Sequence, residues 1–251
     1  MKTIFAFILI VISIPVFSTS DYKIEALAIP YPLGAYLKGE YGYSLPFWKG
    51  SDIFYGFLRP SLSIKSSGKI NTASGRLELY PISIVGGYIE RSNSSRKSDE
   101  LPTFDCGVVA CENSNVERTS YGLRFAFKIS RFYLMSDISR RSINLKGNPK
   151  KTIADEQTTL LAKQGGDRSL QILVSTGFNI NQSTKMGILF KHSEMERLKN
   201  MTNLGILYSK FEFGDSSLLV GPGAFRDRNA HLHPTFLVIY NWVGSKGLLL
   251  F

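Results

Sequence analysis

Beyond its first twenty residues this sequence lacks any long apolar run. The mean hydropathy of the 251 residues is -0.02, which is unusual for a helical membrane protein. A transmembrane helix needs about 20 predominantly apolar residues, and the one long apolar segment, residues 4–17, is shorter than that. We therefore do not expect the chain to cross a membrane with helices.

Cysteine and histidine are scarce, with 2 and 3 residues. Cys106 and Cys111 lie in a polar stretch, and the histidine nearest to them in the sequence is His192. A zinc site built on the cysteines would need a further nitrogen or sulfur ligand close by. The sequence thus predicts no metal site and no cofactor. If the chain is exported, the two cysteines should form a disulfide.

Signatures of common enzyme and nucleotide-binding classes are also missing. There is no HExxH, no GxSxG, no phosphate-binding glycine loop and no calcium loop. Lys and Arg number 30 against 20 Asp and Glu, but the basic excess is dispersed along the chain. Dispersed charge argues against a nucleic-acid partner and suits an anionic lipid or polysaccharide surface.

The N-terminal residues have the pattern of a secretory signal peptide. Lys2 precedes the apolar residues 4–17, and the small residues Ser18 and Ser20 allow cleavage after either one. We predict a signal peptide over residues 1–20 and one mature domain over residues 21–251. Export would also bring the two cysteines into an oxidising compartment.

From residue 21 onward the dominant period is two, as in β-strands. Apolar residues at the odd positions of 121–129 alternate with small or basic ones at the even positions. The same alternation recurs in 170–180, 186–191 and 236–242. Each segment is predicted as a strand with one apolar face and one small or charged face. The segment 76–88 changes phase near Pro81, which indicates a bulge or bend.

Short and long connections between these segments alternate. Short ones fall near 66–74, 130, 181–183 and 214–216, and longer ones near 41–50, 91–115, 144–167, 193–200 and 226–231. This alternation is typical of transmembrane barrels, with short periplasmic turns and long outer loops. The strands between them are predicted at 31–40, 53–65, 75–90, 117–129, 131–143, 168–180, 184–193, 201–212, 216–225 and 232–243.

These observations predict an all-β fold, an antiparallel up-and-down transmembrane β-barrel of about ten strands, with 8 or 12 as alternatives. A soluble β-sandwich is the competing fold, because its strands alternate too. In a sandwich the apolar face looks inward, whereas in a membrane barrel it looks out at lipid.

The C-terminal residues carry a resemblance to a class of proteins. The chain ends in Leu248-Leu249-Leu250-Phe251, and a terminal Phe after an alternating strand resembles the insertion signal of Gram-negative outer-membrane β-barrels. The resemblance implies export to the outer membrane and recognition of Phe251 by the barrel assembly machinery. It also implies contact with outer-membrane lipid and lipopolysaccharide. Residues 244–247 interrupt the alternation, so the pattern leaves the end of the last strand open.

Four basic residues on the small or charged faces are candidates for the lumen wall: Arg124, Lys128, Lys185 and Lys191. Rings of basic side chains select anions, but side chains nearly fill the lumen of a small barrel. The same residues could instead pair with Glu78, Asp137 or Glu212. We expect a structural or narrow porin-like role, with anion preference if the lumen is open.

Two other clusters keep a second function open, an outer-membrane hydrolase acting on lipid A, phospholipid or peptide. His192 and Ser193 resemble the His/Ser neighbourhood of outer-membrane lipid A deacylases, although adjacent strand residues point to opposite faces. Asp227 and His231, followed by His233, resemble the His/Asp rim of outer-membrane aspartyl-type proteases. The sequence favours a non-enzymatic role over either site. A third alternative is surface adhesion or binding through the Cys106–Cys111 loop.

Overall fold

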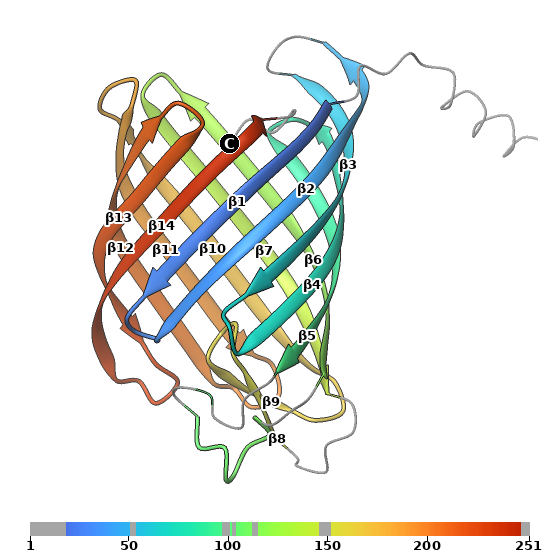
Figure 1. Cartoon of the computed structure of the whole chain (residues 1–251), viewed down its shortest axis with the longest axis vertical. Helices are drawn as coiled ribbons and strands as arrows, with labels where there is room; N and C mark the ends of the chain where they lie inside the picture. The colour runs from blue at the N-terminus through green and yellow to red at the C-terminus, as the bar shows by residue number, and fades with distance from the viewer. Residues whose placement is uncertain are drawn as a thin grey trace, which may run out of the picture.

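A computed structural model describes residues 19–246, except 51–53, 97–100, 102–103, 112–114 and 146–151. Residues 1–18 of the predicted signal peptide and the predicted assembly signal, Phe251, therefore lie outside the described residues. The described chain forms a closed antiparallel barrel of twelve strands and a separate two-stranded hairpin at one end (Figure 1). It contains no helix that is long and apolar enough to cross a membrane.

The barrel strands follow one another around the wall in chain order. They are β1 (Thr19–Ile29), β2 (Gly34–Lys49), β3 (Tyr55–Ser66), β4 (Ile70–Ile82), β5 (Val85–Arg96), β6 (Asn115–Ile129), β7 (Phe132–Leu145), β10 (Asp167–Asn179), β11 (Thr184–Met195), β12 (Met201–Phe213), β13 (Ser216–Arg226) and β14 (Leu232–Lys246). Between β7 and β10 the chain forms the hairpin of β8 (Thr152–Asp155) and β9 (Leu160–Lys163). Pairing of β1 with β14 closes the barrel, so no strand edge is left free.

The count of twelve corrects the expected count of about ten and matches one of its alternatives. Strand β1 precedes the first predicted strand, 31–40, and was not predicted. The predicted strand 75–90 is two strands, β4 and β5, joined by a turn at Ser83 and Ile84. The bulge predicted near Pro81 is present as a register shift between Leu79 and Ile82. Directly after this bulge the chain reverses direction in the turn at Ser83 and Ile84.

The long connections gather at the end of the barrel opposite Thr19 and Lys246, the two ends of the described chain (Figure 1). The turns at 83–84, 130–131, 180–183 and 214–215 lie at the same end of the barrel as Thr19 and Lys246. Two expectations about connections were wrong. Residues 41–50 belong mostly to β2, and the connection expected over 66–74 is a turn at 67–69 on the long-loop side. Short turns face the periplasm in such barrels, which makes the long-loop end the outer one.

The outer surface of the barrel is apolar. Leu62, Leu123 and Leu207 point outward and are 69%, 67% and 61% exposed. At the barrel end that holds Thr19 and Lys246, the ring centroids of Tyr22 and Trp242 are 5.6 Å apart. Aromatic residues at this position are typical of the aromatic girdle of a membrane barrel. An apolar band around a closed barrel is stable in lipid rather than in water. The protein is thus an outer-membrane β-barrel, and the competing β-sandwich is excluded.

Candidate functional site: the lumen and its plug

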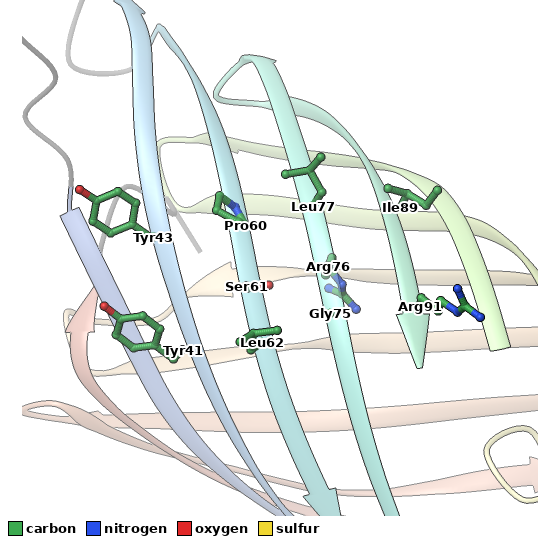
Figure 2. A pocket seen from close by; sticks show the side chains of 10 residues that line it. All are labelled: Tyr41, Tyr43, Pro60, Ser61, Leu62, Gly75, Arg76, Leu77, Ile89 and Arg91. Carbon is green, nitrogen blue, oxygen red and sulfur yellow. The ribbon is translucent and has the colours of Figure 1, made fainter. Parts of the chain in front are cut away.

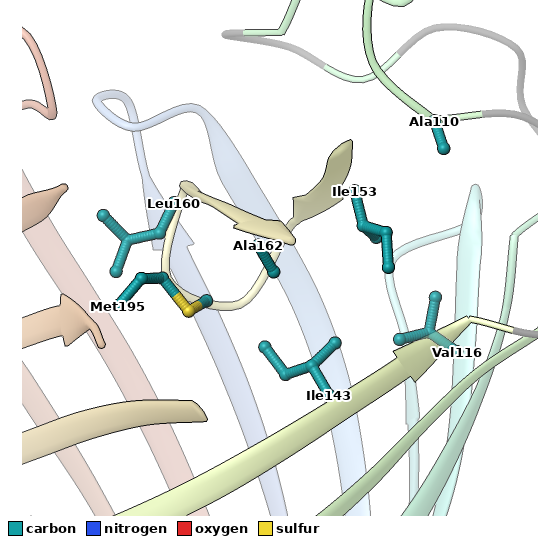
Figure 3. Packing of buried hydrophobic residues seen from close by; sticks show 7 residues of the cluster. All are labelled: Ala110, Val116, Ile143, Ile153, Leu160, Ala162 and Met195. Atoms are coloured by element: carbon teal, nitrogen blue, oxygen red, sulfur yellow. The ribbon is translucent and has the colours of Figure 1, made fainter. Parts of the chain in front are cut away.

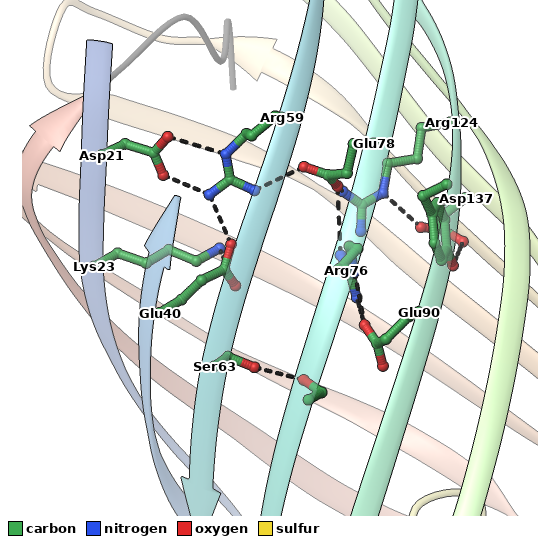
Figure 4. A network of polar contacts seen from close by, with 12 residues as sticks. Asp21, Lys23, Glu40, Arg59, Ser63, Arg76, Glu78, Glu90, Arg124 and Asp137 are labelled. Carbon is green, nitrogen blue, oxygen red and sulfur yellow. Dashed lines mark hydrogen bonds and ion pairs between the residues drawn. The ribbon is translucent and has the colours of Figure 1, made fainter. Parts of the chain in front are cut away.

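One wall of the lumen carries a network of buried charges centred on Arg59 (Figure 4). Arg59 is 1% exposed, and its guanidinium donates to Asp21, to Glu40 at 2.9 Å and to Glu78 at 2.7 Å. Arg59 and Glu78 are direct cross-strand partners in β3 and β4. A buried arginine surrounded by three carboxylates is compensated in charge, whereas loss of one member would leave an unpaired buried charge.

The same network continues to β6 and β7 through Arg124. This side chain contacts Glu78 at 2.5 Å and Asp137 at 2.8 Å, and Asp137 is its cross-strand partner. Arg76 adds contacts to Glu90 and to Glu78. Strands β1 to β7 thereby build a polar lumen wall in which acids and bases alternate.

The opposite wall of the lumen is apolar and rests on a close approach of two tyrosines. Ile206, Tyr208 and Leu237 are buried there, and the hydroxyls of Tyr133 and Tyr208 lie 2.6 Å apart. Between their strands run β10 and β11, where Gly177 and Gly187 leave the space that the phenols occupy. A Cβ on Gly177 would lie 2.7 Å from the Tyr133 hydroxyl. The lumen therefore carries the Arg59 network on one side and an apolar cluster around Tyr208 on the other.

The hairpin β8–β9 folds into the outer mouth of the lumen as a plug (Figure 3). We use the word plug for residues 152–163. Its Ile153, Leu160 and Ala162 pack against Val116, Ile143 and Met195 of the barrel wall, and all six are fully buried. Asn200, in the loop after β11, exchanges two hydrogen bonds with the backbone of Leu161, at 3.0 and 2.9 Å. Apolar packing and backbone hydrogen bonds together hold the plug in place.

Two carboxylates at the tip of the plug pair with arginines of the barrel wall. Asp155 accepts from Arg118 at 2.9 and 3.2 Å, and Glu156 contacts Arg118 at 2.7 Å and also contacts Arg96. Burial alone would raise the pKa of Asp155, but Arg118 and Arg141 outweigh burial and lower this pKa from 3.8 to about 2. Burial is likewise outweighed at Glu156, whose pKa Arg118 and Arg96 lower. Both carboxylates are consequently charged at neutral pH.

The predicted disulfide is formed and lies against the plug. Cys106 and Cys111 are bonded, with their Cα atoms 5.3 Å apart. Next to Cys111, Ala110 donates its N–H to Thr152 at 2.9 Å and accepts from Ala154 at 3.3 Å. Leu101, Val109 and Cys111 pack on Ala154. The disulfide loop thus clamps the plug from the outer side.

Sequence reasoning missed the plug because it predicted residues 144–167 as one long outer connection. The signal was present in two short apolar stretches, 153–154 and 160–162, on either side of the polar residues 155–159. These stretches are too short to distinguish a buried hairpin from an exposed loop by periodicity. Only their packing against the barrel wall identifies them.

The four basic residues proposed for the lumen wall differ in their surroundings. Arg124 belongs to the charge network, and Lys185 pairs with Glu212 at 2.8 Å. Lys191, near the outer end of β11, is half-buried. Lys128 is exposed beside the turn at 130–131. Two of the four, Arg124 and Lys185, are therefore paired with carboxylates.

The structure separates the side chains of the first catalytic candidate, His192 and Ser193, and brings together those of the second, Asp227 and His231. His192 places its Nδ1 2.7 Å from the side-chain oxygen of Asn203, while the adjacent Ser193 is 2% exposed on the inward face of β11. Asp227 and His231, in the loop after β13, meet His233 at the start of β14, with Asp227 Oδ2 3.2 Å from His233 Nε2 and 3.6 Å from His231 Nδ1.

A groove also marks the outer wall of the barrel, among lipid-facing side chains (Figure 2). Pro60 and Gly75 keep its floor low between Tyr41 and Leu77. Its lining is Tyr41, Tyr43, Pro60, Ser61, Leu62, Gly75, Arg76, Leu77, Ile89 and Arg91. Because this groove faces lipid and not the lumen, it belongs to the membrane-contact surface.

Comparison with known proteins yields structural likeness alone. No protein-family model and no curated protein sequence matches the chain. Three solved structures illustrate the likeness. The β domain of the Bordetella autotransporter BrkA has a TM-score of 0.42 at 9% identity, covering 90% of this chain and 98% of that one. OmpT, an outer membrane protein of Vibrio cholerae, has a TM-score of 0.41 at 7% identity, covering 92% and 100%. LpxR from Salmonella typhimurium has a TM-score of 0.41 at 8% identity, covering 89% and 99%. At these identities the likeness does not extend to function.

Proposed function

We propose that this outer-membrane barrel is a plugged narrow pore, closed at rest by the hairpin β8–β9 and anion-preferring when the plug leaves. The observation that carries the proposal is the packing of the plug in the outer mouth, where Asp155 and Glu156 pair with Arg118 and Arg96. A segment inserted in this way separates the lumen from the outside.

The anion preference follows from which charges move with the plug. Asp155 and Glu156 are on the plug, whereas Arg96, Arg118, Arg141, Lys65 and Lys191 are on the wall. Lys191 lies within electrostatic range of Arg141 and Lys65. Withdrawal of the plug removes two acids and leaves several basic side chains at the mouth. Rings of basic side chains favour anions.

The deciding experiment is conductance in planar bilayers, with residues 152–163 replaced by a short Gly-Ser linker. We expect the natural chain to stay mostly closed and the linker variant to conduct, with a reversal potential in a salt gradient that reports anion preference. Adding Arg118→Met to the linker variant should weaken that preference and leave the pore open.

Retention of heat-modifiable gel mobility shows that each variant still forms a barrel. A folded linker variant without conductance would refute the pore and leave a structural barrel. A conducting variant that prefers cations would refute the anion preference alone.

A further inference from the structure

A cluster of metal-ligating side chains lies outside the lumen, at the outer rim of the barrel. Asp227 and His231 are in the loop that follows β13, and His233 is the second residue of β14. One ligand atom from each of the three lies within 4.8 Å of the others. Two of the three side chains are imidazoles, which suit zinc, copper and nickel.

The geometry of the cluster is close to that of a tetrahedral metal site. Ligand atoms on a tetrahedral zinc stand roughly 3.3 Å apart, given bonds of about 2.0 to 2.1 Å. The carboxylate oxygen Asp227 Oδ2 is 3.2 Å from His233 Nε2 and 3.6 Å from His231 Nδ1. Only the two histidines must approach each other, and the His231 side chain is 72% exposed and able to rotate.

The surroundings hold two of the ligands in place. Asp227 accepts the N–H groups of Asn229 and His231 on its other oxygen, Oδ1, both at 2.9 Å, which leaves Oδ2 directed at the imidazoles. The ring of His233 stacks on Tyr31 with centroids 3.9 Å apart. Groups that orient ligands in this way are typical of metal sites.

The charge of the cluster also suits a cation. Asp227 contributes one carboxylate to the cluster. The nearby cation, Arg228, is turned to the plug, where it donates to the Thr159 carbonyl at 3.3 Å and covers the ring of Phe104.

We propose that Asp227, His231 and His233 bind one divalent transition-metal ion at the outer rim, with at least one coordination position open to solvent. This revises the prediction from the cysteines that the chain holds no metal. The site is independent of the proposed pore, because none of its ligands is in the plug or the charge network. An ion there would tie the loop after β13 to β14.

The test is titration of the purified full-length barrel in detergent with Zn²⁺, followed by calorimetry, and with Co²⁺, followed by its visible absorption. We expect one equivalent of Zn²⁺ to bind and tetrahedral-type Co²⁺ absorption to appear. Loss of a ligand should weaken binding by more than the roughly 10- to 100-fold that loss of a supporting group costs. This loss is expected for His231→Ala and for Asp227→Asn, whose amide oxygen can still accept the two N–H groups.

The matched control is His192→Ala, which removes the third histidine of the chain and should leave binding unchanged. Heat-modifiable mobility verifies that each variant is folded. The proposal is overturned if the natural chain binds no Zn²⁺ in stoichiometric amount. It is equally overturned if His231→Ala and Asp227→Asn bind as tightly as the natural chain, or if His192→Ala abolishes binding.

Discussion

At the scale of single residues, buried charges in this barrel depend on their partners. Arg118 has a fully buried side chain and is the common partner of Asp155 and Glu156. Removing one partner of a buried ion pair typically costs about 3 to 5 kcal/mol, because the other charge is left uncompensated. The attachment of the plug is consequently sensitive to the protonation of two carboxylates.

This sensitivity predicts that the plug detaches only in strong acid. The pKa of Asp155 is about 2 in the folded chain against 3.8 for the free side chain. A lowered folded pKa stabilises the folded state above the unfolded pKa, and the stabilisation is lost as the pH falls toward the folded value. That difference amounts to about 2 kcal/mol. It should be present at neutral pH and disappear between about pH 4 and about pH 2.

Pepsin digestion at a series of acidic pH values, with cleavage sites identified by mass spectrometry, would measure this. Cleavage within residues 152–163 should begin well below pH 4 in the natural chain, after correction for the pH profile of pepsin on an unfolded substrate. The variant Asp155→Asn should be cleaved at higher pH. Equal protection of the two proteins over the whole range would contradict the role given to Asp155.

At the scale of elements, the disulfide loop and the plug act together. Ala110 adds a parallel bridge to Ile153, so the loop continues the small sheet of the plug. A loop of this length restrains the unfolded chain by roughly 2 kcal/mol. The restraint acts locally, because the barrel strands do not depend on the cysteines.

We therefore predict that reduction loosens the plug and leaves the barrel intact. Dithiothreitol should increase trypsin cleavage at Lys163 several-fold, while heat-modifiable mobility stays the same. The double variant Cys106→Ser/Cys111→Ser should be cleaved as fast without reductant as with it. Cleavage that does not respond to reduction would show that the disulfide has no part in holding the plug.

Most elements could be predicted from the sequence, and each missed element has its own physical cause. Alternation identified β6, β10 and β11 because one face of each is steadily apolar. In β1 the outward face is apolar, but the inward face changes from Asp21, Lys23 and Glu25 to Leu27 and Ile29, so the alternation is lost in the second half of the strand. The turn between β4 and β5 is Ser83-Ile84, without the Gly, Asn or Asp that marks a tight turn.

The sites were less accessible to sequence reasoning, because they depend on register between distant segments. Arg59 reaches Asp21, 38 residues away, and Arg118 reaches Asp155, 37 residues away. No local sequence pattern predicts either ion pair. The rim cluster was visible in part, since Asp227, His231 and His233 are close in sequence, but their convergence depends on the shape of the loop after β13.

At the scale of the whole molecule, the strand order predicts how the barrel is oriented in the outer membrane. The twelve strands place Thr19, Lys246 and most of the short turns at one end and the plug, the disulfide loop and the rim cluster at the other. All parts with a proposed function beyond the barrel itself are therefore on the outer side of the membrane.

Thiol labelling in intact cells would verify this orientation. Asn229 is in the loop after β13, Asp215 is in the turn before β13, and both are exposed. The natural cysteines are bonded to each other and leave no free thiol among the described residues. A membrane-impermeant maleimide should label Asn229→Cys in intact cells and Asp215→Cys only after the outer membrane is permeabilised. The reverse pattern would place the plug in the periplasm.

The pairing of β1 with β14 also has a consequence for how the chain folds. Ala26 lies opposite Tyr240, so the contact that completes the wall joins segments from the two ends of the described chain. Contacts of such long sequence separation form slowly, because a large loop must close first. Until then both β1 and β14 offer unpaired backbone groups, which are templates for aggregation. The finished barrel wall has no free edge, and we expect a chain in which β1 and β14 are still unpaired to be the form that most needs a chaperone.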